Sequence, residues 1–158
     1  MTAQVKPIPE GCNTLTPHLV VRDAAKAIEF YQQAFGAQLC GIHRTPDGKV
    51  MHAALRVGNS MLMLNDEFPN WNVFSPLSPG GGTSVTVHIY VEDVDAAFAR
   101  AVTAGARVKM PVADMFWGDR YGVLIDPSGH QWSLATRTKE LSEREIEEAG
   151  KAAFANMA

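Results

Sequence analysis

Two stretches of the chain share one pattern of hydrophobic and polar positions. HLVVRD begins at His18 and HIYVED begins at His88, seventy positions later. In each copy the first and third residues after the histidine are apolar. Successive side chains of a strand point to opposite faces, so each copy predicts a strand with one face on a core and its histidine on the other face.

An alanine-rich helical pattern follows each copy, over 24–34 in the first and 94–104 in the second. Asp23 and Asp93 stand just before these runs. Each is a suitable N-cap, because its carboxylate accepts the unpaired backbone N–H groups of a first helical turn. A glycine ends each run. The pattern therefore predicts one helix after each strand.

The other apolar runs predict strands in the same order in both copies. In the first copy they are 16–21, 42–44, 50–57 and 60–64, and in the second 84–91, 108–110, 121–125 and 131–135. Turn-forming phrases such as PDG and DPSG separate them. Each copy thus reads β-α-β-β-β, and the repeat predicts an α+β protein built from two equivalent modules.

The repeat divides the chain into five segments. They are an N-terminal extension (1–13), a first βαβββ module (14–66), an inter-module loop (67–83), a second βαβββ module (84–138) and a C-terminal helix (139–158). The loop carries Phe68, Trp71 and Phe74 among prolines and glycines, so we expect either a segment pinned to the core or a flap over a ligand. A capping box, Ser142 to Glu145, begins the last helix, which we expect to pack against the body or a second subunit.

Strand alternation places the candidate chemistry on the face away from the helices. His18 shares that face with Val20, and His88 shares it with Thr86 and Tyr90. If the modules pair about a pseudo-twofold axis, both imidazoles look into one groove.

Two facing imidazoles suggest a metal, because neutral imidazole binds zinc, nickel, iron or copper. A firm site needs three or four protein ligands. The same offset makes Met63 and Ser133 equivalent on the last strands, and neither carries a carboxylate. We therefore expect His18 and His88 to be an incomplete metal-ligand set, with either no metal or a weakly held zinc, nickel or iron ion.

Other side chains are candidates for contact with a small molecule. His52 is either a groove residue or a hydrogen-bonded structural histidine. In FWGDRY, Trp117 can stack on a flat group and Arg120 can bind a carboxylate or phosphate; alternatively Asp119 and Arg120 form a surface pair beside a packed Trp117. The ligand-binding set that we predict comprises His52, Met63, Tyr90, Trp117, Arg120 and Ser133.

Bulk properties exclude some classes of partner. A net charge of −3, with no lysine and arginine stripe, predicts no nucleic-acid partner. No apolar stretch approaches the length that spans a bilayer, so we expect no membrane partner. The two cysteines lack Cys-x-x-Cys spacing and no signal-peptide pattern precedes them, which favours a cytoplasmic protein with reduced thiols.

Four phrases of the sequence resemble the vicinal oxygen chelate superfamily, which holds glyoxalase I, bleomycin-resistance proteins and extradiol dioxygenases. They are TPHLVVRD (16–23), AIEFY (27–31), FWGDRYG (116–122) and DPSGH (126–130), and the likeness spans residues 14–138. It is nearest to the bacterial glyoxalase-like sequences of uncharacterised function. The resemblance implies paired βαβββ modules forming a cupped mixed sheet, with the helices on its outer face, completed in a homodimer.

The resemblance also implies positions for metal ligands. Glyoxalase members place one ligand on the first strand and one on the last strand of each module. His18 and His88 match the first-strand positions, whereas Met63 and Ser133 stand where glyoxalases have glutamates. The glyoxalase isomerase mechanism lacks its proton-moving glutamate here, and metal-free drug-binding members show that the fold persists without these ligands.

The sequence thus predicts a homodimeric protein that holds a small molecule in a groove of its sheet, with an incomplete or absent metal site. Two alternatives stay open. One is a divalent-metal-dependent lyase, isomerase or dioxygenase that uses His18 and His88. The other is a non-catalytic structural or regulatory dimer, although a purely structural sheet does not need a polar and aromatic open face. Whether the modules pair within one chain or between two also stays open.

Overall fold

The computed structural model describes residues 5–155, so parts of the expected N-terminal extension and C-terminal helix lie outside the described residues. The first module contains β1 (His18–Val21), α1 (Ala24–Phe35), β2 (Gln38–Arg44), β3 (Val50–Val57) and β4 (Ser60–Asp66). The second contains β5 (Thr86–Tyr90), α2 (Val94–Ala104), β6 (Arg107–Asp114), β7 (Asp119–Ile125) and β8 (Gln131–Arg137). A 3₁₀ turn, η1 (Pro69–Trp71), lies in the loop between modules, and α3 (Glu143–Ala155) follows β8. The α+β class and the β-α-β-β-β order are confirmed.

Each module has its own four-stranded mixed sheet, in the order β1-β4-β3-β2 or β5-β8-β7-β6. The first strand pairs in parallel with the last, and the other neighbours are antiparallel. The two parallel pairs have the same register, because His18 lies opposite Met63 and His88 lies opposite Ser133. The internal repeat in the sequence is therefore a repeat in the structure.

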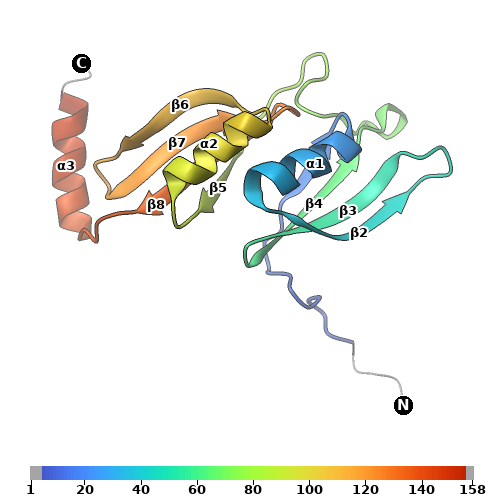
Figure 1. Cartoon of the computed structure of the whole chain (residues 1–158), viewed down its shortest axis with the longest axis horizontal. Helices are drawn as coiled ribbons and strands as arrows, with labels where there is room; N and C mark the ends of the chain where they lie inside the picture. The colour runs from blue at the N-terminus through green and yellow to red at the C-terminus, as the bar shows by residue number, and fades with distance from the viewer. Residues whose placement is uncertain (1–4, 156–158) are drawn as a thin grey trace.

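The helices begin where the sequence predicts. The side chain of Asp23 accepts a hydrogen bond from the backbone N–H of Lys26 at 3.2 Å, and that of Asp93 accepts one from Ala96 at 3.0 Å. Both helices lie on the same side of the molecule, over one face of the sheets (Figure 1). Their buried residues are Ala24, Ala27, Ile28, Phe30, Tyr31 and Ala34 on α1, and Val94, Ala97, Phe98 and Ala101 on α2.

Five strands are longer than the alternation predicts, and the difference is largest for β2 and β6. β2 begins at residue 38 instead of 42, and β6 extends to residue 114 instead of 110. Both pair with one neighbour only and both contain register shifts, as between Leu39 and Gly41 on β2. A bulge interrupts alternation and an edge strand is largely exposed, so the hydrophobic pattern that marks a strand is lost there.

The modules are joined by a buried hydrogen-bonded hub, which we call the Asp126 hub. The hydroxyl of Tyr31 on α1 donates to Asp126 Oδ2 at 2.5 Å, and the indole N–H of Trp132 on β8 donates to the same oxygen at 2.8 Å. Backbone N–H groups of Ser128 and His130 donate to Oδ1. The first module thereby supplies a donor to a carboxylate of the second, and burial raises the pKa of Tyr31, which keeps its hydroxyl protonated.

The inter-module loop is held by Glu67 and not by its aromatic rings. Glu67 Oε1 accepts hydrogen bonds from the backbone N–H of Ser75 at 2.8 Å, from its hydroxyl at 2.5 Å and from that of Ser78 at 2.6 Å. Trp71 stacks on Phe68 with 5.1 Å between ring centroids, yet it is 67% exposed. The serine hydrogen bonds lower the pKa of Glu67 to about 2, so the carboxylate stays charged.

α3 stands at one end of the molecule beside β6 and β7 (Figure 1). Its capping box forms as expected, with Glu145 accepting from both the backbone N–H and the hydroxyl of Ser142 at 2.8 Å. The helix meets the second module at Phe116, whose ring lies 5.8 Å from that of Phe154. In the part of the chain that is described, no helix is long and apolar enough to cross a membrane.

Candidate functional site

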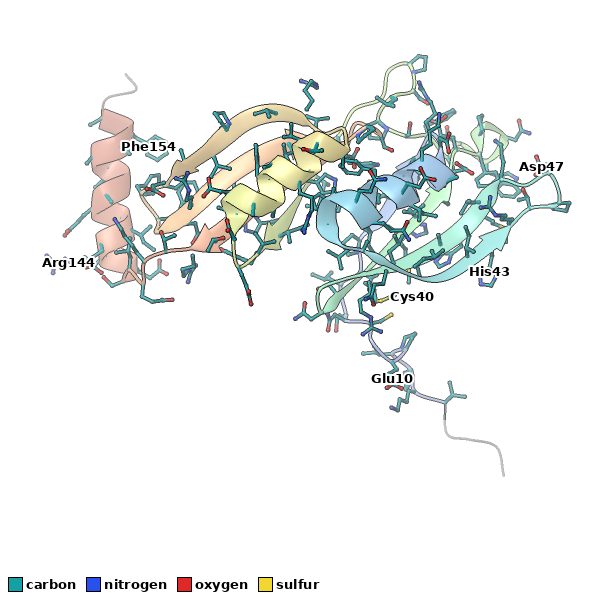
Figure 2. The ribbon with its side chains drawn as sticks, viewed as in Figure 1. Glu10, Cys40, His43, Asp47, Arg144 and Phe154 are labelled. Atoms are coloured by element: carbon teal, nitrogen blue, oxygen red, sulfur yellow. The ribbon has the colours of Figure 1, made fainter. Side chains whose placement is uncertain are left out.

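Three histidines gather on the open face of the first module, away from the helices. His52 lies directly opposite His43 on the neighbouring strand, with 6.4 Å between ring centroids, and the ring of His18 is 5.8 Å from that of His52. Figure 2 shows His43 on β2 at the rim of this face. The sequence left His52 as either a groove residue or a structural histidine and gave no sign of His43 beside it, because the bulged β2 hid the pairing. Burial, reinforced by the nearby His18 and His43, lowers the pKa of His52.

Both first-strand histidines have neutral hydrogen-bond partners. Nε2 of His18 is 2.6 Å from the side-chain oxygen of Asn65, a buried residue of β4 that sequence reasoning missed. Asn65 lies two positions after Met63 and so shares its face of the strand, which was the available signal. Nδ1 of His88 is 2.7 Å from the hydroxyl of Ser133 on β8.

These donors do not fit the metal site that the family resemblance implies. Thioether sulfur and a neutral hydroxyl stand beside the two histidines in place of carboxylates. Across residues 5–155, no three side chains of histidine, cysteine, aspartate or glutamate are arranged to hold a metal ion.

The open face of the second module carries a chain of rings that we call the aromatic wall, formed by His88, Tyr90, Tyr121 and Trp117. The ring of His88 lies 4.6 Å from Tyr90 at 79° and stacks on Tyr121 at 6.0 Å. Trp117 meets Tyr121 edge to face at 5.4 Å. Tyr90 is 57% exposed, so the wall presents ring surface to solvent. Tyr121 was not in the predicted ligand set, although it lies two positions after Asp119 and so shares its face of the strand.

A buried carboxylate orients the aromatic wall. Asp119 is 2% exposed, and its Oδ2 accepts from the hydroxyl of Tyr90 at 2.9 Å and from the indole N–H of Trp117 at 3.2 Å. Its other oxygen accepts from Arg137 at 3.3 Å. A buried charge requires such partners. The rings of Tyr90 and Trp117 are therefore held in place through their polar atoms while their faces stay available.

Arg120 does not join Trp117. It points to the helix side of β7, where Nε and Nη2 donate to the two oxygens of Asp95 on α2 at 2.7 and 2.8 Å, and Nη1 donates to Asp114 at 3.2 Å. The hydrogen bond from Arg120 lowers the pKa of Asp95. Trp117 and Arg120 therefore do not lie together where both could bind one ligand. The alternative ion pair between Asp119 and Arg120 does not form either, since Asp119 pairs with Arg137. Strand alternation separates residues 119 and 120, which is the physical reason.

A cleft runs between the modules, where β1 and β5 each leave one edge of their sheet unpaired. One part of it, the histidine cleft, has a volume of about 540 Å³ and is lined by both His18 and His88. The other part, the helix-side cleft, has a volume of about 720 Å³ and reaches α2. The structure thus brings the two first-strand histidines to one cleft. Partial burial lowers the pKa of His88, and the carboxylate of Asp119 opposes that shift.

The sequence and the fold both match known proteins. The sequence model of the Glyoxalase/Bleomycin resistance protein/Dioxygenase superfamily matches residues 13–134. An uncharacterized protein of Mycobacterium tuberculosis is 50% identical over 137 residues, which is 85% of this chain and 81% of that protein. A Mycobacterium bovis protein, also uncharacterized, has the same identity and is covered over 90% of its length.

Solved structures share the fold over nearly their whole length. TioX from Micromonospora sp. ML1 is 27% identical with a TM-score of 0.64, covering 79% of this chain and 98% of that chain. A gene product of Arabidopsis thaliana is 28% identical with a TM-score of 0.63, covering 78% and 98%. The fosfomycin resistance protein FosX from Mesorhizobium loti is 15% identical with a TM-score of 0.59, covering 84% and 96%, and this likeness concerns the fold alone.

Proposed function

The chain belongs to the Glyoxalase/Bleomycin resistance protein/Dioxygenase superfamily, and on this basis we propose that it binds a small organic molecule in the groove of its sheets without a tightly held metal. The observation that carries the proposal is the aromatic wall oriented by Asp119. A sheet with a purely structural role does not need aromatic rings at its surface whose polar atoms, as in Tyr90 and Trp117, are held by a buried carboxylate.

The aromatic wall suits a flat, partly apolar ligand. Asp119 already holds the rings of Trp117 and Tyr90 in one orientation, so a ligand that stacks on them avoids the entropy cost of ordering them. Stacking of this kind contributes about 1 kcal/mol beyond the burial of apolar area. Tyr90 and Trp117 are the ligand contacts that we propose, whereas Ser133 is buried against His88 and Arg120 is already paired with carboxylates.

The ligand groove that we propose is completed by a second copy of the chain. Within one chain the modules meet through α1, α2 and the Asp126 hub, and both open faces lie away from the helices (Figure 1). An open face with Tyr90 and the half-buried Met61 and Met63 would be covered if the first module of one copy met the second module of another. His52 and Met63 would then face the aromatic wall across the groove.

One observation favours a metal-dependent lyase, isomerase or dioxygenase as the second candidate. The ring of His52 neighbours those of His18 and His43, and imidazole is a ligand for zinc, nickel and iron, although the three rings are not arranged around one ion. Element analysis of protein purified without chelator separates the candidates. Less than one metal ion per several chains agrees with our proposal, and one ion per chain favours the enzyme.

A thermal-shift screen of planar aromatic compounds, followed by titration of the best compound, tests the proposal. Trp117→Ala should weaken binding about fivefold through loss of stacking. Trp71→Ala is the matched control, since Trp71 is exposed on the inter-module loop. If both variants fold and bind as the original protein does, the aromatic wall is not the ligand site.

A further inference from the structure

The helix-side cleft is a second concave site whose walls come from both modules. Residues 87–91, which are most of β5 and the position after it, form one wall, and the β3–β4 hairpin, residues 57–62, forms the other. Phe35 of α1 and Trp132 of β8 contribute aromatic surface to it. Its volume of about 720 Å³ lies within the range of known small-molecule pockets, roughly 300–1,000 Å³.

One cation stands in this cleft. Arg100 of α2 lines it, and its Nε donates to the backbone oxygen of Ala34 at the end of α1 at 3.0 Å. That bond crosses from one module to the other and orients the guanidinium of this exposed side chain. Within residues 5–155, Arg100 takes part in no ion pair, so its terminal N–H groups keep the fork geometry that matches a carboxylate.

The rest of the lining is apolar or neutral. Among the described residues that line the helix-side cleft there is no aspartate or glutamate. Val87, Ile89 and Val91 line it from one side, alternating along the chain with His88 and Tyr90, and Met61 and Leu62 line it from the hairpin. An apolar cleft with a single fixed cation complements a molecule that has a single anionic group and an apolar body.

We infer that the helix-side cleft binds an amphipathic monocarboxylate of the medium-chain fatty-acid class, with its carboxylate on Arg100 and its chain against β5. Burial of the apolar chain drives binding, and the charged hydrogen bonds to the guanidinium set its orientation. This site goes beyond the proposed function, because it rests on Arg100 of α2 and on Trp132, and Trp117 of the aromatic wall does not line it, although His88 and Tyr90 of that wall do.

Quenching of tryptophan fluorescence by a brominated decanoate tests this inference. Trp132 lines the cleft, whereas Trp71 and Trp117 do not, so the double variant Trp71→Phe/Trp117→Phe reports on Trp132 alone. Bromodecanoate should quench this reporter in a saturable way, and unlabelled decanoate should reverse the quenching. Decanol, which has the same chain without the charge, should compete at least about tenfold less well.

Variants of Arg100 locate the carboxylate. On the same reporter background, Arg100→Gln should raise the dissociation constant of decanoate about tenfold or more, while Arg100→Lys should retain much of the affinity. Arg107→Gln on the exposed strand β6 is the matched control and should change nothing. Should Arg100→Gln fail to fold, the comparison of decanoate with decanol on the reporter decides alone.

Three results would overturn the inference: no saturable quenching of Trp132, equal competition by decanol and decanoate, or unchanged affinity in a folded Arg100→Gln variant. The first result would also be found if a second copy of the chain filled the cleft. These results remain distinguishable from the test of the aromatic wall, because that test changes Trp117, which does not line this cleft.

Discussion

Both first-strand histidines are hydrogen-bonded to uncharged side chains, His18 to Asn65 and His88 to Ser133. A neutral partner does not favour the protonated imidazole as a carboxylate would, and partial burial disfavours it. The pKa of His88 is accordingly lowered in spite of Asp119 nearby. At neutral pH the ring of His88 is therefore a polar, uncharged surface.

Metal binding should be created by restoring the missing carboxylates. In Met63→Glu/Ser133→Glu, each glutamate would lie opposite a first-strand histidine, and carboxylate with imidazole is a strong zinc or nickel donor set. Equilibrium dialysis should show tighter binding of either ion than in the original protein. Met63→Gln/Ser133→Gln controls for side-chain volume.

A stoichiometric, tightly held ion in the original protein would contradict this view. Ser133 is 2% exposed, and an unpaired buried charge destabilises a fold. Thermal unfolding of both double variants should therefore accompany the dialysis.

Stability should depend on pH through His52. Its pKa is lowered in the folded protein by burial and by His18 and His43, so the unfolded chain binds more protons. Stability is therefore fully present above the ordinary histidine pKa of about 6.5 and falls as the pH drops from there to the lowered value. Urea unfolding at about pH 5 and about pH 7.5 should show a smaller loss for His52→Gln than for the original protein. A loss of the same size would mean that other groups dominate.

Elements with complete local signals could be predicted from the sequence, and elements without them could not. The helices have an aspartate cap, an apolar stripe and a final glycine, and both were placed within a residue or two. β2 and β6 have bulges and one free edge, so their alternation fails. The same bulged strand hid His43, and the true partner of Asp119, Arg137, comes from a neighbouring strand that only the register reveals.

The cap of α2 offers a test at the scale of one element. Asp93→Ala removes the side-chain acceptor for the N–H of Ala96 and should lower the free energy of unfolding by about 1 kcal/mol. Glu92→Ala, one position earlier and outside the cap hydrogen bond, should have little effect in the same chemical denaturation experiment. Equal effects of the two changes would argue against capping as the cause.

At the scale of the molecule, the modules meet through their helices and leave two open faces of different character. The first carries His18, His43 and His52, and the second carries the aromatic wall. The groove that we propose needs the two faces to meet. A symmetric dimer would bring the first module of each copy against the second module of the other and so form two such grooves.

Sedimentation should therefore show a dimer at roughly tens of micromolar chain, a range in which weak dimers are populated. Tyr90→Arg should shift the protein toward monomer, since it puts a charge on an open face, while Lys109→Glu on the exposed edge strand β6 should not. If the original protein is monomeric at that concentration, the proposed assembly is wrong, and each open face would lack the opposite wall of the groove.

The Asp126 hub has a consequence for how the two repeats depend on each other. Its carboxylate belongs to the second half of the chain, and one of its donors, Tyr31, belongs to the first. Separated halves would each lose a packed partner: Asp126 would lose Tyr31 as a donor, and the Tyr31 ring would lose its packing against Trp132, 5.4 Å away. The duplicated unit is therefore not self-sufficient, and what unites the halves is this shared proton donor together with the helix contact, rather than the continuity of the polypeptide through residues 67–83. Cleavage of the polypeptide within this loop would leave two fragments that still need each other to fold.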